Sequence, residues 1–233
     1  MGELMKIYSK LLHSFGPLHW WPVTSEGKLH PEYSGGPTNE KQQLEVIFGA
    51  ILTQNTSWKN VEKAIAELNK NNLVDAEKIF NIENKKLAEI IRSSGYHNQK
   101  AKKLKNFCEF LFKNCQGELK NLFQKEVPEL RKELLSVNGI GPETADSIIL
   151  YSAKKPIFVI DAYTKRIMGR IGFNEESYGQ LQQLFMRNLQ NSEKLFNEYH
   201  ALLVELGKNY CKTIPLCNKC PLKKDCNYYN LNK

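Results

Sequence analysis

The stretch that decides the fold is VNGIGPETAD, residues 137–146. A helical pattern, ELRKELLS, ends at residue 136, and Pro142 then stands where a second helix begins. Proline is favoured at the first position of a helix because the N–H that it lacks would have no partner there. The sequence therefore predicts two helices joined by a short glycine-bearing turn, which is a helix–hairpin–helix.

The turn itself allows two interpretations. Gly139 and Gly141 permit backbone conformations closed to other residues and leave backbone amides uncovered. Uncovered amides beside a helix N-terminus can bind an anionic phosphate without regard to base identity. The alternative is an ordinary turn between two helices, and the turn alone does not separate these interpretations.

Apolar residues recur at helical spacing along most of the chain. In SWKNVEKAIAELNKN, Val61, Ala64, Ile65 and Leu68 share one helix face. Further helices are expected at 40–54, 97–114, 127–136, 142–153, 175–189 and 192–210. The one extended run is PIFVID, residues 156–161, and it has no obvious partner strand. The expected fold class is all-α.

The chain is basic, with 33 Lys and Arg against 25 Asp and Glu among 233 residues and a formal net charge of +8. This excess favours a polyanionic partner, most simply nucleic acid. No run reaches the roughly 18 apolar residues that a membrane span needs. The first residues, MGELMKIYSK, lack the apolar core of a signal peptide. We therefore expect a cytoplasmic protein without a membrane partner.

Four of the six cysteines crowd near the end of the sequence with the spacing C-x5-C-x2-C-x5-C. They are Cys211, Cys217, Cys220 and Cys226. In a reducing compartment such a cluster indicates a metal centre rather than disulfides. A zinc ribbon normally pairs two short knuckles across a longer loop, whereas here one short pair is flanked by two medium arms.

Downstream of the hairpin, FVIDAYTKRIMGRIG places Asp161 where an extended run ends and a helix begins. An aspartate there can cap the helix. The order of hairpin, helix, extended run and Asp161 resembles the helix–hairpin–helix DNA glycosylase superfamily, of which endonuclease III is the best-known type. The resemblance implies that Asp161 is catalytic. It would stabilise the positive charge that develops on the sugar as the N-glycosidic bond breaks.

The same resemblance indicates what Glu143 implies for the reaction. Bifunctional members of the superfamily carry a lysine at this position, and its amine forms a Schiff base with the sugar and nicks the strand. A carboxylate cannot form an imine, so an enzyme without the lysine-based lyase activity is expected. Glu143 itself either favours the helix N-terminus electrostatically, by about 0.3–1 kcal/mol, or takes part in catalysis by holding a water near the sugar.

The cysteine tail resembles the [4Fe–4S] site of many endonuclease III relatives, whose spacing is C-x6-C-x2-C-x5-C. The first gap is one residue shorter here. The resemblance implies a [4Fe–4S] cofactor held by the four cysteines. It also implies a monovalent cation, Na⁺ or K⁺, bound at the hairpin by the backbone carbonyls of Leu135, Val137 and Ile140.

Two segments in the front half, GAILTQNTSWKNVEKA and SGYHNQKAKKLK, resemble further parts of the superfamily. The first implies that Gln54 fills the gap that a flipped base leaves in DNA. The expected DNA-binding residues are Gln54, Asn55, Lys100, Gly139, Ile140 and Gly141. The alternatives are a helix-terminal glutamine without a DNA contact and a solvated lysine-bearing helix face.

In GPLHWWPV, Trp20 and Trp21 either close a core or form a stacking platform for a base. A cationic base such as an alkylated purine would gain cation–π attraction there. Together, HWWP, GAILTQNT, SGYHNQKAK and GIGPETAD look like the 3-methyladenine DNA glycosylase III branch of the superfamily, over roughly residues 5–210. That branch removes alkylated purines, notably 3-methyladenine, and leaves an abasic site.

The resemblance also implies two helical subdomains around a central cleft. Residues 37–154 would form a six-helix domain ending in the hairpin, and residues 1–36 with 155–233 would form the domain that carries the iron–sulfur cluster. The expected partner is double-stranded DNA with a damaged base, and the expected protein is a nucleoid-associated monomer. The alternatives are a glycosylase for mismatched uracil or thymine, one for oxidised purine or mispaired adenine, and a non-catalytic DNA-binding module.

Overall fold

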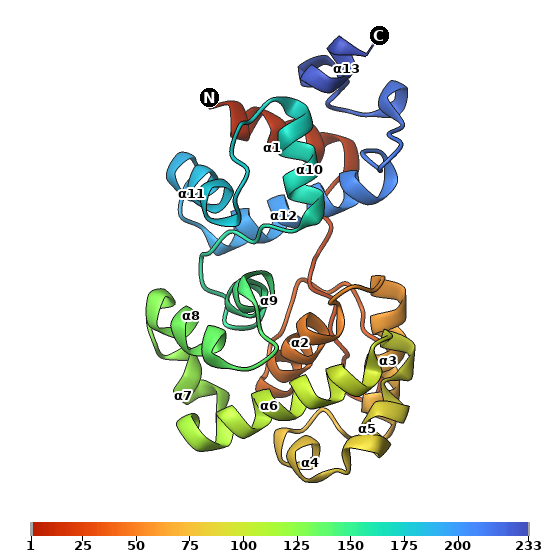
Figure 1. Ribbon diagram of the computed structural model, residues 1–233, viewed down its shortest axis with the longest axis vertical. Helices are drawn as coiled ribbons and strands as arrows, with labels where there is room; N and C mark the ends of the chain where they lie inside the picture. Colours follow the sequence, from red (N-terminus) through yellow and green to blue (C-terminus); the bar gives the residue numbers. More distant parts are fainter. Residues whose placement is uncertain (1, 233) are drawn as a thin grey trace. The chain divides into compact units, whose positions relative to one another are not determined.

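The computed structural model describes residues 2–232, and helices are the main secondary structure of these residues (Figure 1). The α-helices are α1 (Glu3–Phe15), α2 (Glu40–Leu52), α3 (Trp58–Lys70), α4 (Ala76–Asn81), α5 (Asn84–Ile90), α6 (His97–Cys115), α7 (Leu119–Phe123), α8 (Val127–Ser136), α9 (Pro142–Ser147), α10 (Ala162–Ile171), α11 (Tyr178–Asn188), α12 (Glu193–Asn209) and α13 (Asn227–Leu231). Within the described residues the extended run 156–161 forms no strand, and the sole β-bridge joins Val23 and Glu32. The prediction of an all-α fold is confirmed. No helix in the described part of the chain is long and apolar enough to cross a membrane.

The chain divides into two compact units. The middle unit is continuous and runs from Trp21 to Lys155, whereas the terminal unit combines the residues up to Trp20 with those from Pro156 onward. Residues 21–36 were expected with the termini, but the structure places them in the middle unit. Within this segment, Val23 and Glu32 exchange two backbone hydrogen bonds of 3.0 and 2.9 Å.

Helix α2 forms the centre of the middle unit. Every residue from Leu44 to Leu52 is buried, and α3, α6 and α9 pack around the helix. Each fully buried Leu, Ile or Val contributes about 1.5–3 kcal/mol. Asn39 caps the start of α2 by accepting a hydrogen bond from the Gln42 amide at 2.9 Å. Helix α2 therefore fixes the position of the turn that follows it, at residues 53–57.

The one carboxylate inside this apolar stretch, Glu45, anchors the segment 21–36. Its side chain accepts the Thr24 amide at 2.7 Å and the Asn69 side-chain amide at 3.0 Å. Burial raises the pKa of Glu45, and the hydrogen bonds from Asn69 and Thr24 act in the opposite direction. These contacts explain why the segment joins the middle unit.

In the terminal unit, α12 packs against α10 and α1. The Phe158 and Phe185 rings stack at 3.9 Å, and the buried Tyr199 hydroxyl donates to the Leu4 carbonyl at 2.8 Å. Gly207 permits a close approach to α10, because a Cβ at this position would lie 2.5 Å from the Tyr163 ring. This packing fixes the start of α10, where Asp161 lies.

Candidate functional site

The hairpin between α8 and α9 depends on one of its two glycines more than on the other. Gly139 has a φ of +97°, and a Cβ at this position would lie 2.4 Å from Cγ of Lys103. Gly141 has an ordinary φ of −95°, and a Cβ there would meet nothing within 4 Å. Gly139 is therefore required by both backbone conformation and space, while Gly141 leaves the exposed face of the turn open.

The structure brings most of the predicted DNA-binding residues to one pocket of about 510 Å³ in the middle unit. Its lining consists of Gln54, Asn55, Lys103, Gly139, Ile140, Gly141, Pro142, Glu143 and Thr144. We call it the hairpin pocket. Five of the six predicted DNA-binding residues thus share this pocket with Glu143, although the two sequence segments lie far apart along the chain.

Gln54 ties the turn after α2 to the hairpin. Its side-chain amide donates to the Gly139 carbonyl at 3.1 Å and to the Thr144 hydroxyl at 2.9 Å. The Lys103 ammonium group donates to the side-chain oxygen of the same glutamine. To fill a gap in DNA, Gln54 would have to exchange these contacts for contacts with the duplex.

Lys100 is buried and its ammonium group donates to backbone carbonyls, so the prediction of a DNA contact for this residue has to be corrected. Its side chain is 2% exposed, and Nζ donates to the carbonyls of Leu52 at 2.7 Å and Ser94 at 2.6 Å. Burial, with a smaller effect of Lys103, lowers the pKa of Lys100 to about 8. The side chain instead joins the end of α2 to the short 3₁₀ helix at Arg92–Ser94.

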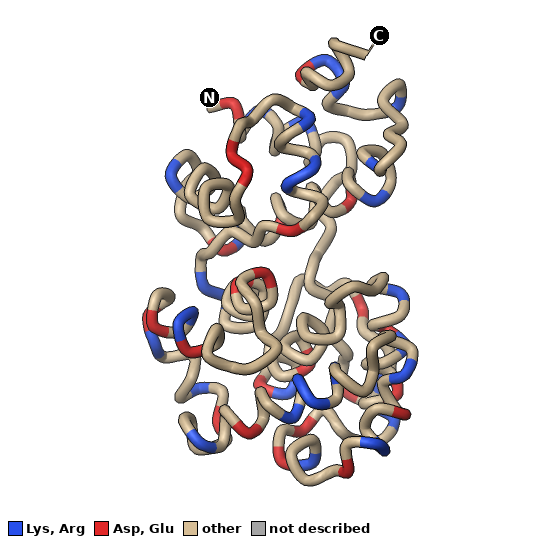
Figure 2. Tube along the Cα trace, in the orientation of Figure 1, with Lys and Arg blue, Asp and Glu red and all other residues tan. Residues whose placement is uncertain are grey.

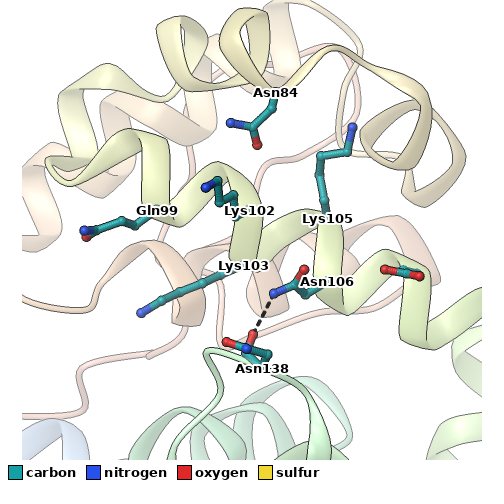
Figure 3. A pocket seen from close by; sticks show the side chains of 8 residues that line it. Asn84, Gln99, Lys102, Lys103, Lys105, Asn106 and Asn138 are labelled. Atoms are coloured by element: carbon teal, nitrogen blue, oxygen red, sulfur yellow. Dashed lines mark hydrogen bonds between the residues drawn. The ribbon is translucent and has the colours of Figure 1, made fainter.

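Basic residues colour parts of α6 blue in Figure 2, and Figure 3 shows Lys102, Lys103 and Lys105 of this helix beside the hairpin. They border a second pocket of about 560 Å³, lined by Asn84, Gln99, Lys102, Lys103, Lys105, Asn106, Glu109 and Asn138. The Asn106 side chain donates to the Asn138 carbonyl at 3.0 Å, which joins α6 to the hairpin. Lys103 lines both pockets, so the basic face of α6 continues into the hairpin pocket.

Glu143 lies exposed in the first turn of α9, two residues after Gly141. A carboxylate at this end of a helix is favourable because the backbone N–H groups carry partial positive charge. No lysine stands between Gly141 and Ser147. The primary amine in the hairpin pocket is that of Lys103 in α6, whose ammonium group donates to Gln54.

An ion pair that the sequence does not reveal holds the two hairpin helices together. Asp146 in α9 is fully buried, and Arg131 in α8 reaches it with Nε–Oδ1 at 2.7 Å and Nη2–Oδ2 at 3.2 Å. The two parallel hydrogen bonds give a planar guanidinium–carboxylate pair with a fixed geometry. No spacing pattern marks this pair, because it forms only when the two helices pack.

The predicted cation site uses three carbonyls at the end of α8 and in the turn. The carbonyl of Val137 accepts the Ile140 amide at 3.0 Å. A carbonyl oxygen has a second lone pair, so this bond leaves it able to ligate an ion. The Leu135, Val137 and Ile140 site stays a prediction.

Asp161 caps α10, as its position predicts. Its Oδ1 accepts the Thr164 amide at 2.7 Å, and its Oδ2 lies 3.8 Å from Nε2 of His200 in α12. Both side chains are largely buried. Burial lowers the pKa of His200, and the nearby Asp161 carboxylate acts in the opposite direction. His200 is a neighbour of Asp161 that the sequence did not identify.

The two adjacent tryptophans lie in different environments. Trp21 is 5% exposed in the core of the middle unit, where its ring meets Trp58 edge-on at 5.0 Å and Tyr151 at 5.1 Å. A Cβ at Gly49 would lie 3.1 Å from the same ring. Core packing therefore accounts for Trp21, and base stacking is not supported for it. Trp20 is half-buried in the terminal unit, and base stacking stays a prediction for this residue.

The four cysteines of the tail line one small cavity, together with Arg170, Tyr210, Pro215, Lys223, Tyr228 and Tyr229. In residues 2–232 no three His, Cys, Asp or Glu side chains are already arranged to ligate an ion. Burial raises the pKa of Cys220 to about 11, a hydrogen bond with the Leu222 backbone acts in the opposite direction, and the three neighbouring thiols add smaller upward effects. Four converging thiols are the donor set of an iron–sulfur or a zinc centre, so these residues fit a metal.

Two arginines of α10 hold the cysteine loop. Arg170 donates from Nη1 to Sγ of Cys211 at 3.3 Å and to the Lys212 carbonyl at 2.6 Å. Arg166 donates to the Cys211 carbonyl at 2.8 Å. Donors directed at a sulfur stabilise a thiolate ligand, which is a further sign of a metal centre.

The chain is similar in sequence to known DNA repair proteins. The model of the family described as HhH-GPD superfamily base excision DNA repair protein matches residues 48–191. The Methanocaldococcus jannaschii protein MJ1434, provisionally assigned as a DNA repair glycosylase, is 43% identical over 227 residues, which cover 96% of this chain and 95% of that protein.

Solved structures share the fold. The H. pylori 3-methyladenine DNA glycosylase MagIII bound to 1,N6-ethenoadenine has a TM-score of 0.71 at 28% identity and covers 89% of this chain and 98% of its own. A non-covalent endonuclease III–DNA complex has a TM-score of 0.78 at 20% identity and covers 100% of this chain and 99% of its own. The resemblance inferred from the hairpin and Asp161 is confirmed at the level of the superfamily.

Proposed function

Because the chain belongs to the HhH-GPD superfamily of base excision DNA repair proteins, we propose that it is a monofunctional DNA glycosylase for alkylated purines. Membership of the superfamily makes it a DNA repair glycosylase, and the proposal concerns the base and the fate of the strand. The observation that carries it is Glu143, which borders the hairpin pocket where bifunctional relatives have lysine.

The proposed reaction is hydrolysis of the N-glycosidic bond. The bond between C1′ and the base nitrogen breaks, the cationic base leaves as a neutral molecule with the bonding electrons, and water adds to C1′ and loses one proton to solvent. Asp161 stabilises the positive charge that develops on the sugar, and its orientation is fixed by the Thr164 amide. Exposed amides of the hairpin bind a phosphate, and the lysines of α6 attract the backbone next to it.

The choice of an alkylated purine rests on two features. MagIII, a 3-methyladenine DNA glycosylase, is similar over 89% of the chain, and its structure contains 1,N6-ethenoadenine. Trp20 is partly exposed, so its indole can stack on a cationic base. N3- and N7-alkylated purines are such bases, and their positive charge already weakens the glycosidic bond.

Purified protein is expected to release 3-methyladenine from methylated DNA because this base is a good leaving group. The measurement is single-turnover base release on a panel of duplexes with alkylated purine, mismatched uracil or thymine, oxidised purine and mispaired adenine. Release from one of the other duplexes, with none from methylated DNA, would show that the proposed substrate is wrong. No release from any of them would favour a non-catalytic DNA-binding module.

Borohydride is expected to trap no covalent adduct between this protein and abasic DNA, because residue 143 is a carboxylate. Denaturing gels of the borohydride reaction, with endonuclease III as the positive control, measure the adduct. The abasic strand should also stay whole without borohydride. Efficient trapping of the protein would show that another amine reaches C1′, and the monofunctional proposal would then be wrong.

We also propose that Cys211, Cys217, Cys220 and Cys226 hold a [4Fe–4S] cluster, because all four line one cavity and resemble the cluster motif. Anaerobically purified protein is expected to be brown and to contain about four irons per chain. Cys220→Ser should lose iron, while Cys108→Ala should retain it, since Cys108 is buried in α6 of the middle unit. Stoichiometric zinc instead of iron would contradict the cluster.

A further inference from the structure

The two oxygens of Asp161 have different partners. Oδ1 accepts the Thr164 amide at 2.7 Å, a short hydrogen bond within the first turn of α10. Oδ2 faces Nε2 of His200 at 3.8 Å, and this imidazole comes from a different helix, α12. The side chains of His200 and Asp161 are only 10% and 12% exposed. The pair is therefore built into the junction of α10 and α12.

Burial of an imidazole costs free energy unless its N–H group has a hydrogen-bond partner. Burial lowers the pKa of His200, so the neutral ring is favoured. A neutral ring has one N–H, which can be carried by Nε2 and directed at the carboxylate. The distance of 3.8 Å is longer than a hydrogen bond. Contacts of catalytic groups are often long without substrate and shorten in the complex.

Other charged groups of the neighbouring helices are directed elsewhere. In α10, Lys165 lies 6.0 Å from a tyrosine ring, and Arg166 donates to two backbone carbonyls. In α12, Glu198 accepts a backbone amide at 2.7 Å. The carboxylate of Asp161 is the charge that acts on His200.

We propose that His200 is the positioning residue of the catalytic carboxylate, with its Nε2–H fixing Oδ2 of Asp161 as the Thr164 amide fixes Oδ1. The inference rests on the proposed function, in which Asp161 stabilises charge on the sugar. A carboxylate held from both sides needs no reorientation when that charge develops. Thr164 alone fixes one oxygen and leaves the plane of the carboxylate free to turn.

The test compares His200→Leu with His200→Gln in the full-length protein. Two quantities are measured: the single-turnover rate of base release on the duplex that the wild type processes, and the Kd for a duplex with a tetrahydrofuran abasic analogue. His200→Leu is expected to lower the rate about 10- to 100-fold, because small misplacements of a catalytic group have effects of this order. Its Kd should stay within about twofold, since positioning acts after binding. His200→Gln keeps an N–H donor and should recover most of the rate.

Tyr199→Phe is the matched control for packing. It lies beside His200 on α12 and loses the hydroxyl bond to the Leu4 carbonyl, so it should lower Tm and leave the rate unchanged. A wild-type rate in His200→Leu, or equal losses in the Leu and Gln variants, would overturn the positioning role. A separate variant tests the proposed function. If Asp161→Asn keeps the full rate of base release, the carboxylate is not catalytic and the positioning role of His200 is also wrong.

Discussion

Asp161→Asn is expected to lower the rate of base release on the order of 10³-fold, because an uncharged amide cannot stabilise the positive charge on the sugar. The fold should not change. Asn is as good an N-cap as Asp, so its side-chain oxygen can still accept the Thr164 amide. Single-turnover base release measures the rate, and binding to a duplex with an abasic analogue should stay near the wild-type affinity.

Asp161→Ala separates the charge from the cap. It removes both, so the rate of base release should fall as it does in the Asn variant. The missing cap should also lower the free energy of unfolding by about 1 kcal/mol. Thermal unfolding of the two variants measures this difference. An Asn variant that is stable and fully active would show that the carboxylate does not carry the chemistry.

Arg131→Met is expected to lower the free energy of unfolding by about 3–5 kcal/mol, because it removes the guanidinium that pairs with the fully buried Asp146 carboxylate. For a chain of this length this corresponds to a fall in Tm of roughly 6–20 °C. The loss should also weaken DNA binding, since the pair joins the two helices that carry the hairpin. Thermal unfolding and a DNA titration check both effects.

Lys113→Met is the surface control for this prediction. It breaks an ion pair of 2.5 Å with Glu109, but both side chains are exposed. Exposed pairs contribute about 0–1 kcal/mol, so Tm should change little. A second variant, Arg131→Met with Asp146→Leu, removes both charges and should recover much of the lost stability. Equal effects of the buried and surface variants would refute the role assigned to the buried pair.

Local signals in the sequence predicted the parts of the site that depend on local structure. Gly139 and Pro142 mark the hairpin because a positive φ and a helix start are properties of single positions. Asp161 marks the start of α10 for the same reason, and its cap is present. The spacing of the cysteines likewise placed four thiols around one cavity.

The errors concern residues whose role depends on packing between distant segments. Lys100 resembles its neighbours Lys102 and Lys103 in the sequence, and its burial follows only from the way α6 meets the end of α2. Trp21 and Trp20 are adjacent, yet the chain passes from one unit to the other between them. No pattern within either segment carries this information.

His200 was missed for a similar reason. A single histidine on the apolar side of a helix gives no periodic signal, and its significance comes from Asp161, which lies on another helix. The segment 21–36 was assigned to the wrong unit because its composition indicates a loop. The segment packs in the middle unit because Glu45, a carboxylate inside the next helix, binds it.

The division of the terminal unit between the two ends of the chain has a consequence for synthesis. The Leu4 carbonyl in α1 receives its hydrogen bond from Tyr199, a residue made 195 positions later. At about 5–20 residues per second, this partner leaves the ribosome roughly 10–40 s after α1. The apolar face of α1, formed by Leu4, Ile7 and Leu11, has no completed unit to pack against during that interval. The continuous middle unit can fold first, so the apolar face of α1 stays uncovered in a nascent chain whose middle unit is already native, until α12 emerges.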